Sequence, residues 1–332
     1  MKKIRIAQIG TSANSHGNMI WESLIKQNDI FDVVGYALPE NERVKCTTQA
    51  AAFNGYREMT VEEILSDPTI EAVAVETEEV YLTKYALMAA KAGKHIHMEK
   101  PGGHDLQEFE QMIAAVKAGK KVFHTGYMYR YNPAVAELVD QVKNGELGEI
   151  ISVDAEMSCT HPKTTRDWLN TTKGGMMFFL GCHLIDLVLS IQGKPLKITP
   201  LNRSSGLDEN TFDDFGFAVL EYKNGVSTVK TTDAEMGGFE RRHVCVVGTK
   251  KTVEIRPLEY FYGPLQFATK TDYCSQGWAD KGLVRDTPAF DRYDGMMASF
   301  AAMCRGEKVN PYTPEYELEL YKLVLECAGM KR

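Results

Sequence analysis

The sequence lacks the features that mark several large classes of protein. No apolar run approaches the roughly 18 residues of a membrane span, and the polar stretch 11–16 ends the first apolar run too early for a secretory signal. With a net charge of -7 and no long Lys/Arg block, nucleic acid and membrane surfaces are disfavoured as partners. The seven cysteines show no C-x-x-C spacing, which favours reduced thiols in the cytoplasm. His95 and His97 bring no third ligand, so no metal site is expected.

The first 125 residues alternate between short apolar strands and amphipathic helices. A chain of 332 residues exceeds one ordinary core, so we expect two domains, at 1–126 and 127–332. Thr60 with Glu63 predicts a capping box, a helix is expected from Thr83 to Ala92 with Gly93 as its C-terminal cap, and Asp105 caps a helix that Gly119 closes. Strands are expected at 4–9, 32–37, 72–75, 95–98 and 122–125. This alternation predicts an α/β domain with a parallel, doubly wound Rossmann sheet.

From about residue 148 strand signals follow one another directly. They predict an α+β domain with a large, mostly antiparallel open sheet, and residues 223–225 are expected to form a hairpin turn. The expected strands are 149–158, 215–222, 226–232, 243–248 and 252–256. The expected helices are 132–143, 176–191, 288–304 and 314–328.

The turn after the first strand weakly resembles a dinucleotide fingerprint. Gly10 suits a tight turn before a helix, whose N-terminus attracts anions. Ser12 and Ser15 replace the second and third glycines, so an ordinary strand-to-helix turn is an equally good interpretation. At the end of the second strand Leu38 stands where a carboxylate would hold the ribose, and Arg43 is the nearest arginine for a 2'-phosphate. The choice of cofactor therefore stays open.

Lys100 ends a short strand and is followed by proline and two glycines. Ligands of open parallel sheets lie beyond the carboxyl ends of the strands, which is where Lys100 is expected. Pro101 stops the sheet ladder, and Gly102 and Gly103 allow a close approach to the backbone. The ordinary alternative is a solvated loop lysine, but such a lysine would not need a proline and two glycines directly after it.

A second group of polar residues interrupts an apolar helix. His183 and Asp186, three residues apart, share one helix face. Buried polar groups need partners, so this pair must meet each other, water or a ligand. A core histidine oriented by an aspartate is the ordinary alternative, and the company of Lys100 favours a functional role.

Several segments together closely resemble the Gfo/Idh/MocA family of nicotinamide-dependent oxidoreductases. They are MEKP with its glycines, GYMYRYNP at 126–133, GELGEI at 145–150 and the GG and GCHLID segments up to residue 193. The resemblance implies a Rossmann domain and an α/β domain with an open sheet, and a homo-oligomer, dimer or tetramer. It also implies NAD or NADP as cofactor, with NAD favoured, and a sugar, inositol or related polyol as substrate.

The resemblance assigns roles to individual residues. Lys100 matches the catalytic lysine and His183 the active-site histidine, so His183 is a candidate base and Lys100 polarises the reacting oxygen. The expected cofactor-binding residues are Gly10, Thr11, Ser12, Asn14, Leu38, Thr77, Glu99, Lys100 and Pro101. The expected substrate or supporting contacts are Tyr127, Arg130, Arg166, Trp168 and Asp186.

Two alternatives to simple dehydrogenation stay open. One is a redox-neutral lyase or glycosidase that uses bound NAD, and the other is a non-catalytic ligand sensor. Thr77 is followed by Glu78 and Glu79, where many members of the family have Thr-Pro. These two carboxylates belong either to a solvated loop or to a narrowed nicotinamide rim.

Phe179 replaces the carboxylate that the family pattern places four residues before the histidine. Loss of an anion near Lys100 should lower the pKa of that lysine and favour a neutral base over a fixed cation. We therefore expect Phe179→Asp to shift the pH–rate profile to higher pH. Profiles that coincide for wild type and Phe179→Asp would contradict this hypothesis.

Overall fold

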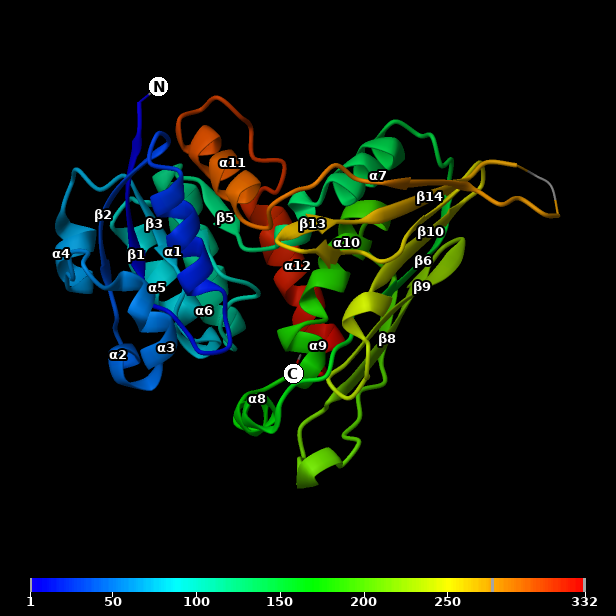
Figure 1. Ribbon diagram of the computed structural model, residues 1–332, viewed down its shortest axis with the longest axis horizontal. Helices are drawn as coiled ribbons and strands as arrows, with labels where there is room; N and C mark the ends of the chain where they lie inside the picture. The colour runs from blue at the N-terminus through cyan, green and yellow to red at the C-terminus, as the bar shows by residue number, and fades with distance from the viewer. Residues whose placement is uncertain (1, 276–277, 331–332) are drawn as a thin grey trace. The chain divides into compact units, whose positions relative to one another are not determined.

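The structure, a computed structural model, describes residues 2–275 and 278–330 and divides into two compact units. The first comprises the chain up to Tyr127 together with Tyr293–Tyr321, and the second comprises Met128–Arg292 and the chain from Lys322 onward. Residues 293–321 thus join the first unit, unlike the expected division at 126/127. The reason is visible in Figure 1, where α11 (Asp294–Cys304) lies beside α1 (Gly17–Lys26). Ser23 of α1 donates a 2.7 Å hydrogen bond to Asp294.

The first unit contains a five-stranded parallel sheet in the order β2-β1-β3-β4-β5. The strands are β1 (Ile4–Ile9), β2 (Phe31–Ala37), β3 (Ala72–Val75), β4 (His95–Met98) and β5 (Phe123–Thr125). Their apolar residues are largely buried, as expected for a sheet covered on both faces. Because every strand runs in one direction, all carboxyl ends meet at one edge of the sheet.

Helices connect these strands. They are α1, α2 (Glu42–Lys45), α3 (Thr47–Ala50), α4 (Val61–Ser66), α5 (Glu79–Lys91) and α6 (Leu106–Gly119), with α11 and the larger part of α12 (Pro314–Cys327) added from the end of the chain. The predicted capping box of Thr60 and Glu63 is confirmed at α4, and Asp105 caps α6 through the Glu108 N–H. Trp21, Tyr36 and Phe53 form a buried aromatic cluster between α1, β2 and the turn after α3.

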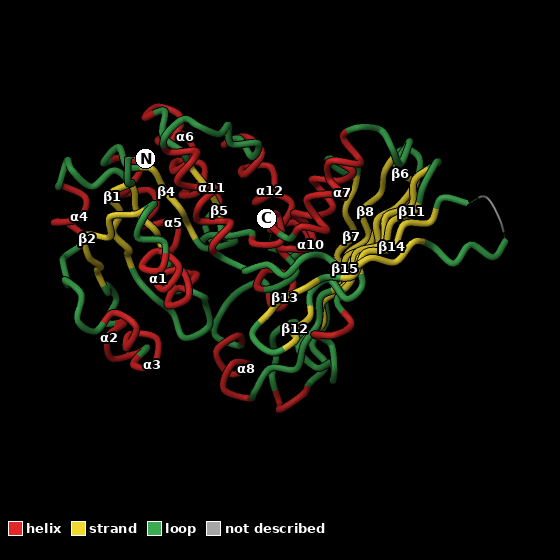
Figure 2. The backbone as a smooth tube through the Cα atoms, turned by 45° about the horizontal axis from the view of Figure 1, so that its top comes forward, coloured by secondary structure: helices red, strands yellow, loops and turns green. Residues whose placement is uncertain are grey.

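The second unit contains an eight-stranded sheet, drawn in yellow in Figure 2. Its order is β15-β14-β11-β10-β6-β9-β8-β7, and every neighbouring pair is antiparallel except β6 with β9. The strands are β6 (Ile150–Glu156), β7 (Lys197–Pro200), β8 (Phe215–Tyr222), β9 (Gly225–Thr232), β10 (His243–Gly248), β11 (Thr252–Ile255), β14 (Thr269–Tyr273) and β15 (Leu283–Asp286). A hairpin of β12 (Tyr260–Tyr262) and β13 (Leu265–Phe267) stands apart. The expected fold class is confirmed.

Two predicted helices of the second unit differ from the structure. Gly175–Phe179 (α9) and Cys182–Gln192 (α10) are separate helices, whereas the sequence predicted one helix over 176–191. The break falls at Leu180 and Gly181, where the Gly181 N–H turns back to the carbonyl of Met176. A Cβ on Gly181 would lie 2.7 Å from the backbone carbonyl oxygen of Met177, so this close turn requires glycine. The helix α7 (Pro133–Lys143) begins one residue later than predicted.

Other boundaries were also predicted wrongly. The helix α5 begins at Glu79 instead of Thr83, and α11 begins at Asp294 instead of 288. The short helix α8 (Lys163–Leu169) and strands β7 and β12–β15 were not predicted, because short amphipathic segments carry weak periodicity. Within residues 2–275 and 278–330, no helix combines the length and apolar character that a membrane crossing requires.

Candidate active site

Most of the predicted cofactor residues lie at the carboxyl edge of the parallel sheet. Gly10 follows β1, Leu38 follows β2, Thr77 lies beyond β3, and Glu99 follows β4. The turn at Gly10 has φ of 89°, and a Cβ there would lie 2.3 Å from the side chain of Thr77. Glycine is thus required both by the backbone conformation and by the contact between two adjacent strand ends.

Gln8 fixes the turn between β1 and α1, and sequence reasoning missed it. Its side-chain amide is fully buried and donates to the carbonyls of Gly10 at 3.0 Å and Gly17 at 2.9 Å. These two bonds join the end of the strand to the first residue of α1. The sequence of the strand does not indicate that the side chain of Gln8 points inward and binds these two carbonyls.

The loop between Gly10 and α1 is also held by polar contacts of its own. Ser12 accepts a 3.2 Å hydrogen bond from the N–H of Asn14, and Glu42 accepts a 3.3 Å bond from the N–H of Thr11. Burial raises the pKa of Glu42 to about 8, so near neutral pH its carboxyl is largely uncharged. A phosphate at this loop would therefore meet little repulsion from Glu42.

A pocket of about 420 Å³ opens at the carboxyl end of β2. Leu38 and Pro39 line it, together with residues of the segment before α4 and of α5. In doubly wound folds the end of the second strand faces the adenosine ribose of a dinucleotide. The pocket and the glycine turn at Gly10 therefore fit the adenosine half of a nicotinamide cofactor.

The glycines after Lys100 serve the protein's own packing. The N–H of Gly103 donates to Thr83 Oγ1 at 2.8 Å, and the Tyr321 hydroxyl donates to the Gly103 carbonyl at 2.6 Å. A Cβ on Gly102 would lie 3.0 Å from the Phe109 ring, which stacks on Tyr321 with centroids 4.0 Å apart. The predicted close approach to this backbone is thus made by α5, α6 and α12, which fix the position of Lys100. The peptide bond between Lys100 and Pro101 is cis.

Three carboxyl groups of the same unit act on Lys100. Its Nζ lies 3.8 Å from Glu99 Oε1, and its positive charge also lowers the pKa values of Glu76 and Glu79. Burial nevertheless dominates: it raises the pKa of Glu79 and of Glu99 to about 7, and it raises the pKa of Glu76 well above its ordinary value. Glu79 is only 6% exposed, so the interpretation of this residue as part of a solvated loop is wrong.

A buried polar chain continues from Glu76 along the sheet. His97 Nε2 lies 3.3 Å from Glu76 Oε1, and His97 Nδ1 lies 2.8 Å from His124 Nδ1. Burial lowers the pKa of His97 to about 4, so this ring is neutral near pH 7. His97 and His124 are direct partners across β4 and β5, a pairing that only the register reveals.

Gly126 and Tyr127 directly follow β5. Tyr127 is buried and its N–H donates to the Thr125 carbonyl at 2.8 Å. A Cβ on Gly126 would lie 2.7 Å from Glu99 Oε2, so this glycine makes room for the Glu99 carboxyl.

In the second unit Arg130 and Asp186 form a buried two-point ion pair. Arg130 Nε donates to Asp186 Oδ2 at 2.9 Å and Nη2 donates to Oδ1 at 2.7 Å. Both side chains are 2% exposed. The predicted need of Asp186 for a partner is thus met by Arg130. His183 packs edge-on against the Tyr129 ring, with centroids 5.1 Å apart.

Tyr129 leads into a second polar cluster that the sequence did not reveal. Its hydroxyl donates to Glu259, and Arg242 Nη1 reaches both the Tyr129 hydroxyl, at 3.0 Å, and Glu259 Oε1, at 3.1 Å. Arg292 and Gln266 bind the other oxygen of Glu259. Burial raises the pKa of Tyr129 beyond the range in which phenols ordinarily titrate, so Tyr129 acts as a neutral donor.

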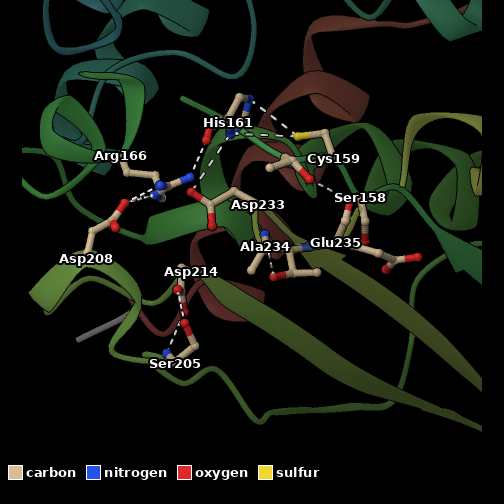
Figure 3. A network of polar contacts seen from close by, with 12 residues as sticks. Ser158, Cys159, His161, Arg166, Ser205, Asp208, Asp214, Asp233, Ala234 and Glu235 are labelled. Atoms are coloured by element: carbon tan, nitrogen blue, oxygen red, sulfur yellow. Dashed lines mark hydrogen bonds and ion pairs between the residues drawn. The ribbon is translucent and has the colours of Figure 1, made fainter. Parts of the chain in front are cut away.

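Arg166 lies in a separate network, shown in Figure 3. Its guanidinium donates to Asp208, at 2.9 Å from Nε, and to the His161 carbonyl. Asp233 is fully buried and faces the same network, with Oδ2 3.9 Å from His161 Nδ1. Burial and the neighbouring Asp214 raise the pKa of Asp233 to about 6.

Trp168 and Phe179 pack together in the same unit. Their rings lie 5.4 Å apart at 72°, beside a buried cluster of Leu169, Met176 and Phe212. Phe179 thus has an apolar packing role where the family pattern has a carboxylate. Trp168 supports this aromatic contact from α8.

The parallel sheet with a glycine turn and a pocket at its carboxyl edge defines a dinucleotide-binding domain. The oxidoreductase family model with an NAD-binding Rossmann fold matches residues 4–127, and the GFO/IDH/MocA C-terminal domain model matches residues 135–254. The chain belongs to the Gfo/Idh/MocA oxidoreductase family, and the predicted recognition of that family is confirmed.

Individual relatives are distant. Trans-1,2-dihydrobenzene-1,2-diol dehydrogenase of Bos taurus is 27% identical over 279 residues, covering 80% of this chain and 78% of the relative. A structure from Desulfitobacterium hafniense, named as an NADPH-dependent oxidoreductase, has a TM-score of 0.81 at 18% identity, covering 99% of this chain and 95% of that one. A levoglucosan dehydrogenase in complex with NADH and levoglucosan has a TM-score of 0.78 at 19% identity, covering 99% and 98%. These structures share the fold, and the cofactor expectation of NAD or NADP is confirmed.

The Arg130–Asp186 pair should be structural as well as functional. Asp186→Asn leaves a buried guanidinium without its counter-charge, and we expect the free energy of unfolding to fall by about 3 kcal/mol. Urea denaturation measures this loss. The control is Asp167→Asn, which breaks the exposed Lys163–Asp167 pair on α8 and should cost less than about 0.5 kcal/mol. Equal losses in the two variants would contradict the structural role.

The raised pKa of Glu79 predicts a pH-dependent stability. A carboxyl with an ordinary pKa of 4.5 in the unfolded chain and about 7 in the folded protein binds its proton more tightly when folded. Wild type should therefore lose stability as the pH rises from 5 to 8, by about 2 kcal/mol relative to Glu79→Gln. Unfolding by urea at each pH measures the difference. Glu62→Gln, at an exposed position on α4, should follow wild type throughout. Parallel curves for wild type and Glu79→Gln would show that Glu79 is ionised in both states.

Proposed function

We propose that this protein is an NAD(P)-dependent dehydrogenase or reductase that transfers a hydride between the cofactor and a hydroxyl or keto group of a sugar, inositol or glycoside. Membership of an NAD-binding oxidoreductase family supports hydride chemistry. The names of relatives that act on a diol or bind levoglucosan support a hydroxylated substrate. The cofactor, when bound, supplies the hydride acceptor or donor.

The observation that carries this proposal is the placement of Lys100. Lys100 lies just past the carboxyl end of β4, and its amine is buried beside Glu99. Thr83 and Tyr321 fix the loop that follows it by binding the backbone of Gly103. A cation held in a largely dry setting acts strongly on an oxygen that gains negative charge in the transition state. We assign to Lys100 the stabilisation of the substrate oxygen.

His183 is the proposed proton acceptor and donor. Imidazole suits this task near neutral pH, and the Tyr129 ring fixes one side of the His183 ring. We assign to Glu99 and Pro101 contacts on the nicotinamide side of the cofactor. Tyr127, Arg166 and Trp168 remain proposed substrate contacts, whereas Arg130 and Asp186 support the site through their mutual pair.

Replacing the amine tests the proposal directly. We expect Lys100→Met to lower kcat by about a thousandfold, because the charge that stabilises the developing alkoxide is lost. The assay follows absorbance of the reduced nicotinamide across a panel of polyols and sugars with both cofactors. Fluorescence titration should show that the variant still binds reduced cofactor, and Lys91→Met, at an exposed position on α5, is the matched control.

Three outcomes separate the proposal from its alternatives. Product formed without net reduction of cofactor would indicate a redox-neutral cycle. Cofactor binding without turnover of any member of the panel would favour a ligand sensor. Full activity in Lys100→Met would remove Lys100 from the mechanism.

A further inference from the structure

The pocket at the end of β2 contains several charged groups. Leu38, at the position that usually holds the adenosine ribose, has no hydrogen-bonding side chain. The lining includes two carboxylates, Glu58 and Glu62, and the ammonium group of Lys84. Glu40 follows Leu38 by two residues and reaches the same region through Lys84 and Tyr85.

Two cations at or near this pocket, Lys84 and Arg43, are bound to carboxylates. Lys84 Nζ donates to Glu40 Oε1 at 2.6 Å, and the Tyr85 hydroxyl donates to the same oxygen at 2.7 Å. The ammonium also lies 4.8 Å from the centroid of the Tyr85 ring. Lys84 is the largest cause of the lowered pKa of Glu40, and Lys45 is the smallest one named.

Arg43, the nearest arginine to Leu38, is held in the same way. Its Nη2 donates to Glu58 Oε2 at 2.7 Å and to the Tyr36 hydroxyl at 2.6 Å, and its Nε lies 3.3 Å from Glu58 Oε1. The guanidinium carbon lies 5.8 Å from the Tyr36 ring centroid. Glu58 is itself placed by a bridge to Tyr36 beside β2. The fork of Arg43 is therefore engaged by a carboxylate and a phenol.

These contacts bear on which dinucleotide the pocket accepts. A 2'-phosphate brings close to two negative charges and needs cations that are available to it, above all an arginine fork. Here it would compete with Glu58 for Arg43 and with Glu40 for Lys84, and Glu62 would add a further negative charge. A ribose with a free 2'-hydroxyl brings no charge and avoids this repulsion.

We propose that Glu58 and Glu40 make this protein select NAD over NADP, by binding Arg43 and Lys84 and by repelling a 2'-phosphate. The discrimination thus rests on charge repulsion against the wrong cofactor and needs no carboxylate at Leu38. This inference rests on the dinucleotide binding within the proposed function. It extends that function by naming the cofactor and the residues that select it.

Fluorescence titration with NADH and NADPH tests the selection without any turnover. Wild type should bind NADH at least tenfold more tightly than NADPH. Glu58→Gln and Glu40→Gln should each strengthen NADPH binding at least fivefold, while NADH binding changes less than twofold. The double variant should strengthen NADPH binding further, and added salt should reduce its gain.

Asp32→Asn is the matched control. It removes the carboxylate of the exposed Arg5–Asp32 pair, 2.7 Å long, at the opposite end of β1 and β2. Its ratio of NADH to NADPH affinity should equal that of wild type. A thermal melt of each variant verifies folding. Because Glu40 and Glu58 are partly exposed, we expect both variants to fold, and if one does not, the other still tests the proposal.

The failures of this inference and of the proposed function differ. If wild type binds NADPH as tightly as NADH, or if neither carboxylate variant changes the ratio, the selection by Glu40 and Glu58 is wrong while hydride transfer stands. If neither dinucleotide binds, both proposals fail. Binding of NADH alone without turnover would leave the selection supported and overturn the enzymatic function.

Discussion

The buried amine of Lys100 among three carboxyl groups is the interaction on which the chemistry of the first unit depends. Burial raises the pKa values of Glu76, Glu79 and Glu99, and the lysine charge opposes that rise at each of them. The three carboxyl groups are therefore linked electrostatically, because each interacts with the lysine charge, Glu99 acts on Glu79, and Glu76 acts on Glu99. The position of the set is nevertheless fixed, because Thr83 and Tyr321 bind the backbone of the loop that follows Lys100. The fold thus keeps the geometry constant while leaving the charge responsive to pH.

In the second unit, buried charged groups are stabilised by direct pairing. Arg130 and Asp186 lie 56 residues apart in the chain and meet through two hydrogen bonds in a dry setting. That pair ties the segment Met128–Tyr131 to α10, the helix that carries His183. Tyr129, on the same segment, is held by Glu259 and Arg242 and contacts the His183 ring. The orientation of His183 is therefore set by neighbours whose own charges are balanced.

The sequence predicted those elements whose signals are local. Strands 72–75, 95–98 and 215–222 match the structure residue by residue, because each is an apolar or alternating run between breakers. Lys100 could be singled out for a similar reason, since proline and glycine mark its position. The partners of Gln8, Glu76 and His97 could not be predicted, because they depend on strand register and on which side chains face inward. The break between α9 and α10 depends on the packing of Gly181 against Met177, which helical periodicity does not record.

Two departures of this chain from its family pattern, Phe179 and Leu38, each place an apolar residue where the pattern has a carboxylate. In the second unit Phe179 packs on Trp168 where the family pattern has a carboxylate. In the first unit Glu79, the first residue of α5, interacts electrostatically with Lys100. Leu38 gives up a carboxylate at the end of β2, and Glu40 places one two residues later, bound to Lys84 and Tyr85. At the end of β2 an acid is thus present two residues from the expected position, and a paired cation lowers its pKa. A motif that considers only position 38 would miss the acid at the end of β2, although Glu40 is present two residues later. Charge near the lysine and the ribose pocket is therefore better judged from spatial neighbours than from aligned letters.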